Sequence, residues 1–173
     1  MSGTLIKIDA YDEQKIDIYV SIPEASHSPG LLLLPDKDLT NDIFFEIANL
    51  FCEEGYVVVA PLLFPHDTQT ITDQNAKPLS AFNADQAMEN IGASLSYLRQ
   101  VKEFTGMVAT LGFGIGGKMS YLAAAHYDLD VCVSFYAPDI EALLDKADDI
   151  SCPIQMHFAE LDKKITEDVV TKI

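Results

Sequence analysis

Residues 107–117 come closest to a catalytic motif, because an apolar run there leads into a glycine-rich turn. The letters Met-Val-Ala-Thr-Leu-Gly-Phe-Gly-Ile-Gly-Gly predict a strand that passes through a tight turn directly into a helix. This is the setting of a nucleophile elbow, where the middle residue of Gly-x-nucleophile-x-Gly is strained and its small neighbours let strand and helix approach. Gly112, Gly116 and Gly117 supply the small neighbours, but the nucleophile position holds Gly114, for which we expect a positive φ.

The rest of the chain predicts the framework that such a turn requires. Residues 5–8 and 15–22 alternate apolar and polar side chains, which is typical of an antiparallel hairpin with one solvent-exposed face. Strands then alternate with helical patterns, and this rhythm predicts an α/β fold with a mostly parallel sheet and helices on both faces. The further strands are expected at residues 30–34, 56–61, 107–111, 131–136 and 154–158.

Composition and charge narrow the classes of protein that the chain can belong to. Its 173 residues, 49% of them hydrophobic and 22% charged, suit one soluble domain over residues 1–173. With 27 acidic and 11 basic residues, the net charge of −16 argues against nucleic acid and anionic membranes as partners. No apolar run is long enough to span a bilayer and no signal peptide is evident, so we expect a cytoplasmic protein.

The three cysteines are an odd number at wide spacings, which favours reduced thiols over a disulfide framework. We expect each of Cys52, Cys132 and Cys152 to be a buried core residue rather than a nucleophile. Nothing in the sequence calls for a metal or another cofactor.

Three stretches give the sequence a specific resemblance. Residues 112–117, Gly-Phe-Gly-Ile-Gly-Gly, resemble the elbow of the dienelactone hydrolase family, Gly-Phe-Cys-x-Gly-Gly. Residues 53–61 are similar to that family's helix-to-strand junction, and residues 152–162 to its penultimate strand. The resemblance covers essentially the whole chain and implies a three-layer α/β-hydrolase sandwich that supports ester or lactone hydrolysis.

The resemblance also assigns expected roles to residues. The family uses a Cys, Asp and His triad, and Asp162 matches the position of the triad acid. Asp36 stands where the family has a glutamate near the nucleophile, although a turn-forming role is equally compatible with its place in the sequence. The family's oxyanion hole corresponds to the backbone N–H groups of Ile115 and Lys37.

The family's triad histidine lies beyond one further helix and strand, which residues 1–173 do not include. We therefore expect a C-terminally incomplete domain that lacks the last strand and helix, with residues 154–158 as a bare edge that favours homo-oligomers. With Gly114 at the nucleophile position as well, we expect a catalytically degenerate hydrolase, or pseudoenzyme, that Gly114→Cys alone does not rescue. His126 and His157 are expected to be structural, and His66 on the long loop is the most plausible substitute base.

Two other functions remain open. Gly112-x-Gly114-x-x-Gly117 also satisfies the dinucleotide-binding pattern, with Asp139 just past the next strand as the acidic residue. Alternatively, the protein binds a small molecule or another chain above the elbow without chemistry, in a pocket shaped by the long polar loop of residues 62–82.

Overall fold

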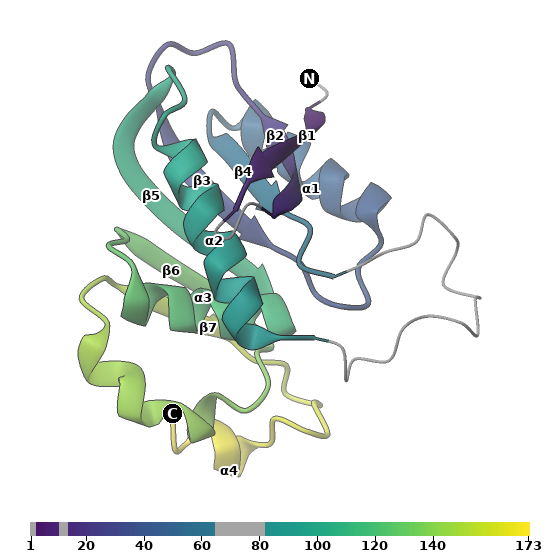
Figure 1. Ribbon diagram of the computed structural model, residues 1–173. Helices are drawn as coiled ribbons and strands as arrows, with labels where there is room; N and C mark the ends of the chain where they lie inside the picture. The colour runs from purple at the N-terminus through teal and green to yellow at the C-terminus, as the bar shows by residue number, and fades with distance from the viewer. Residues whose placement is uncertain (1–2, 11–13, 65–81) are drawn as a thin grey trace.

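The computed structural model describes residues 3–10, 14–64 and 82–173, so His66 and most of the loop that contains it lie outside the described residues. The described strands form one seven-stranded sheet in the order β1-β2-β4-β3-β5-β6-β7 (Figure 1). The strands are β1 (Thr4–Asp9), β2 (Lys15–Ser21), β3 (Ser28–Leu34), β4 (Val57–Pro61), β5 (Phe104–Phe113), β6 (Val131–Phe135) and β7 (Ile154–His157). The helices are α1 (Asn41–Glu53), α2 (Ala84–Leu98), α3 (Ile115–His126) and the short α4 (Glu167–Val170).

The sheet is antiparallel at one end and parallel over the rest, as the sequence predicts. β1 pairs antiparallel with β2, and β2 pairs antiparallel with β4. All other neighbours, from β4 through β3, β5 and β6 to β7, pair in parallel. The register places Leu34 at the end of β3 directly beside Gly112 near the end of β5, and this pairing brings the loops after the two strands together.

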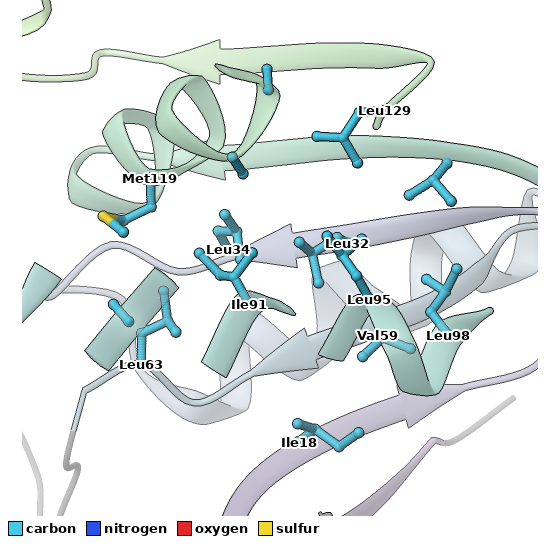
Figure 2. Close-up of a cluster of buried hydrophobic side chains, with 14 of the residues drawn as sticks. Ile18, Leu32, Leu34, Val59, Leu63, Ile91, Leu95, Leu98, Met119 and Leu129 are labelled. Atoms are coloured by element: carbon cyan, nitrogen blue, oxygen red, sulfur yellow. The ribbon is translucent and has the colours of Figure 1, made fainter. Parts of the chain in front are cut away.

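The four leucines that end β3 explain how one apolar run serves two cores. Side chains alternate along a strand, so Leu32 and Leu34 point to one face of the sheet and Leu31 and Leu33 to the other. The first face is covered by α2 and α3, and the second by α1 (Figure 1). Figure 2 shows the first core, where the β-strand residues meet side chains of both helices, among them Ile91, Leu95, Leu98 and Met119.

Local signals account for most helix and strand ends. Gly55, one residue beyond the C-cap of α1, has a φ of 94°, which suits a glycine at a helix end, and α3 follows the glycine-rich turn as predicted. The Asn83 side chain caps α2, which begins at Ala84. Two short 3₁₀ segments, Ile140–Ala142 and Leu144–Asp149, fill the connection between β6 and β7, and the sequence pattern did not predict them. In the part of the chain that is described, every helix is too short or too polar to cross a membrane.

Candidate active site

The predicted elbow is formed by the glycine-rich turn between β5 and α3. Gly114 has a φ of 53° and a ψ of −117°, which confirms the expected positive φ. Side chains are strained in this region, whereas glycine adopts it freely. A Cβ atom added at Gly112 would overlap the backbone of Gly116, and one added at Gly116 would overlap the carbonyl groups of Leu34 and Pro35. Close packing of strand, loop and helix therefore explains these glycines.

The Asp36 carboxylate lies directly over Gly114. A Cβ atom added at Gly114 would overlap this carboxylate, so Asp36 occupies the space that a nucleophilic side chain would need. Asp36 is itself half-buried and lies in the loop after β3. Its position follows from the pairing of β3 with β5, because Asp36 stands two residues after Leu34 and Gly114 two residues after its partner Gly112.

The same carboxylate accepts hydrogen bonds from both backbone groups that correspond, by the family resemblance, to an oxyanion hole. The Lys37 N–H donates to Asp36 Oδ1 at 2.8 Å, and the Ile115 N–H, at the start of α3, lies 3.4 Å from the same oxygen. The second distance is at the long end for a hydrogen bond, so the Lys37 contact is the stronger of the two. The two donors converge, as an oxyanion hole requires, but an oxygen of the chain itself lies between them.

Tyr136 lies close enough to the elbow to be affected by the charges of Asp36 and Asp38. It follows β6, is 40% exposed and has a φ of 39°, which is unusual for a residue with a bulky side chain. Burial, and then the negative charges of Asp36 and Asp38, raise the pKa of the Tyr136 phenol above its ordinary value. The Lys37 ammonium pairs with Asp38, so this cation does not pair with Asp36.

Two of the three described histidines, His126 and His157, pack against aromatic side chains. The His157 ring stacks on Phe135 with centroids 4.3 Å apart and planes at 6°, and Phe135 stacks on Phe113 at 5.3 Å. His126, at the end of α3, packs edge-on against Tyr127 at 4.8 Å. Both contacts give the histidines a packing role, in keeping with the structural role expected for them.

Asp162 holds the turn that precedes α4. Its Oδ1 atom accepts hydrogen bonds from the N–H groups of Lys164 at 2.7 Å and Ile165 at 3.0 Å. The hydrogen bonds from Ile165 and then Lys164 lower the pKa of the Asp162 carboxyl below its ordinary value. The geometry thus gives Asp162 a local structural role, and its match to the triad acid stays a prediction from the resemblance.

The glycine pattern that could bind a dinucleotide has a simpler explanation in packing. A Cβ atom added at Gly117 would lie too close to the Phe135 carbonyl and the Ser134 hydroxyl. Close packing therefore accounts for this glycine, as it does for Gly112 and Gly116. Asp139, the acidic residue of that pattern, lies 3.3 Å from the Lys118 ammonium. Among the described residues, no three His, Cys, Asp or Glu side chains gather as ligands for a metal ion.

The sheet order and the strand-turn-helix elbow define an α/β-hydrolase-like fold, and solved structures share it. A dienelactone hydrolase-like promiscuous phosphotriesterase from metagenomic libraries superposes with a TM-score of 0.80 at 20% identity, over 99% of this chain and 75% of that one. An esterase of Pyrococcus furiosus superposes with a TM-score of 0.76 at 12% identity, over 99% and 76% of the two chains.

The family follows from the sequence comparison. Residues 16–173 match the model of the dienelactone hydrolase family, so the chain belongs to this family. Its relatives include a carboxymethylenebutenolidase of Pseudomonas putida, which is 24% identical over an alignment of 167 residues that covers 91% of this chain and 70% of that protein. Carboxymethylenebutenolidase 1 of Cupriavidus pinatubonensis is 23% identical over an alignment of 172 residues that covers 94% of this chain and 74% of the relative.

Proposed function

We propose that this member of the dienelactone hydrolase family does not carry out covalent ester or lactone hydrolysis. The observation that carries the proposal is the pair at the elbow, where Gly114 provides no side chain and the Asp36 carboxylate fills the vacant space. Covalent acyl transfer begins when a nucleophilic side chain attacks the substrate carbonyl. A glycine cannot form that bond, so the first chemical step is lost at this position.

Electrostatics oppose a water-only mechanism at the same place. An oxyanion that develops on the substrate needs the N–H groups of Lys37 and Ile115, which already face Asp36 Oδ1. Removal of a single oxyanion-hole donor costs about 10²–10³-fold in rate in well-studied hydrolases. The Asp36 carboxylate in the oxyanion hole would also repel the negative charge that develops on the substrate oxygen.

The cysteines of the chain do not replace the missing nucleophile. Cys52 and Cys132 are fully buried, and Cys152 is partly buried. Burial raises the pKa of the Cys132 thiol to about 11, and burial also raises that of Cys152. Because the thiolate is the reactive form, both thiols are poor nucleophiles at neutral pH.

A second candidate function is binding of a ligand without chemistry. It is favoured by backbone strain in the loop beside the elbow. The two non-glycine residues with positive φ among the described residues, Tyr136 and Asp139, both lie in the loop that follows β6. Strained residues of this kind cluster at ligand sites and switch regions. Ligand-induced shifts of the Tyr136 and Asp139 amide resonances would identify such a role, and a screen without any shift at these residues would argue against it.

The proposed loss of catalysis is tested by following p-nitrophenol release from p-nitrophenyl acetate, together with hydrolysis of a small unsaturated lactone. We expect no saturable turnover above buffer. The matched control is Cys152→Ser, which removes the partly buried thiol and identifies any slow, stoichiometric acylation that this thiol causes. Saturable release of many equivalents by both the wild type and Cys152→Ser would contradict the proposal.

A further inference from the structure

We propose that Asp36 is an internal ligand that closes the oxyanion hole against small carboxylates and other oxyanions. The inference rests on the proposed function, because it takes the elbow to be one without a nucleophile. It goes further in assigning a role to a residue that takes no part in covalent chemistry: Asp36 keeps the two backbone donors occupied.

The donors come from separate elements that the sheet holds in place. Ile115 begins α3, separated from β5 by Gly114 alone, and Lys37 lies in the loop after β3. β3 and β5 are neighbouring parallel strands, so their carboxyl ends and the loops that follow meet at one edge of the sheet. Such a pair of converging donors does not depend on the Asp36 side chain, and we expect it to persist when that side chain is shortened.

Shape and charge both make Asp36 an effective occupant. Its carboxylate carries the charge and the planar pair of oxygens that a bound acetate would bring, and Oδ1 lies 2.8 Å from the Lys37 nitrogen. Gly114 is the condition for this arrangement, because any Cβ there would overlap the carboxylate. An external oxyanion therefore competes for the same donors and meets a like charge when it approaches.

The neighbouring Asp38 offers a matched comparison. Asp38 pairs with the Lys37 ammonium and, like Asp36, acts on Tyr136, so its removal changes the net charge near the elbow by the same amount. In contrast with Asp36, it has no contact with the Ile115 N–H among the hydrogen bonds of the described residues. Asp38→Ala therefore tests charge without opening the hole.

The experiment titrates sodium acetate into ¹⁵N-labelled wild type, Asp36→Ala, Asp36→Asn and Asp38→Ala, at constant ionic strength, and follows the amide resonances of Ile115 and Lys37. We expect saturable shifts in Asp36→Ala, with an affinity at least about tenfold above that of Asp38→Ala, the scale of one lost charged hydrogen bond. Asp36→Asn keeps an oxygen in the hole without the charge, so its affinity for acetate should lie between those of the wild type and Asp36→Ala.

Three results would overturn the proposal. The first is that the Ile115 and Lys37 resonances of folded Asp36→Ala match those of the wild type before acetate is added, since the donors would then not have faced Asp36. The second is equal acetate binding by the wild type and Asp36→Ala. The third is equal binding by Asp36→Asn and Asp36→Ala, which would assign the effect to charge alone. Ester turnover by the wild type would contradict the proposed function and leave these readouts unchanged.

Discussion

Gly114 and Asp36 occupy adjoining space at the elbow, and each restricts what the other can be. The backbone at Gly114 has a φ of 53°, so an alanine there carries strain of about 1–3 kcal/mol in addition to its overlap with Asp36. We expect Gly114→Ala to lower the free energy of unfolding by more than this strain alone. In the Asp36→Ala background the penalty should shrink, with a coupling of about 0.5–3 kcal/mol in a double-mutant cycle measured by urea unfolding.

Gly55 provides the control for that cycle. Its φ is 94°, and a Cβ atom added there would meet nothing within 4 Å. Gly55→Ala should therefore show the strain penalty without any coupling to Asp36→Ala. If Gly114→Ala behaves in the same additive way, the carboxylate does not occupy the space over Gly114.

Tyr136 reports the position of the Asp36 charge. Because Asp36 and Asp38 add to the effect of burial on the phenol, we expect Asp36→Asn to lower the pKa of Tyr136, and Asp38→Asn to lower it less. The value should stay above normal in both variants, since burial remains. Titration of ¹³C-labelled tyrosine by NMR measures the shift, and an unchanged Tyr136 pKa in Asp36→Asn would place that carboxylate elsewhere.

Among the elements, α2 depends on a cap that α1 lacks. The Asn83 side chain accepts hydrogen bonds from the N–H groups of Asp85 at 2.9 Å and Gln86 at 3.2 Å. Asn83→Ala should lower the free energy of unfolding by about 0.5–2 kcal/mol. Thr40, at the same position of α1, makes no side-chain cap hydrogen bond, so Thr40→Ala should cost less in the same thermal or urea measurement. Equal costs would argue against the Asn83 cap.

The sequence predicts elements well where the signal is local. The passage from β5 through a tight turn into α3 and the positive φ of Gly114 follow from a run of apolar residues and a cluster of glycines, which act over a few residues. The contact between Asp36 and the elbow joins residues 79 positions apart and depends on the register of β3 against β5. Neither residue type nor spacing encodes that register, so Asp36 could be expected near the elbow by resemblance but not between the two donors.

At the scale of the whole molecule, an open sheet edge and a large net charge act in opposite directions. Among the described strands β7 pairs with β6 alone, and it exposes Ile154, which is 38% accessible. We propose that this edge supports reversible self-association, limited by repulsion between chains that each carry a charge of −16. Association should therefore strengthen as salt screens the charge.

Sedimentation velocity over a concentration series at low and high salt tests this prediction. Ile154→Lys should weaken association because it adds a charge to the edge strand. Leu161→Lys is the control, since Leu161 is 89% exposed and lies outside β7. A monomer at every concentration and salt level would contradict self-association. Equal weakening of association by both variants would show that β7 does not form the contact.

A crystal structure of this 173-residue chain that resolves the Asp36 side chain tests the central claim most directly, namely that this carboxylate has taken the place of a nucleophile above Gly114. The account predicts Asp36 Oδ1 within hydrogen-bond distance of the Lys37 and Ile115 nitrogens, and Gly114 at a positive φ beneath it. An Asp36 side chain turned into solvent, with a water molecule or an anion bound to both N–H groups, would contradict it.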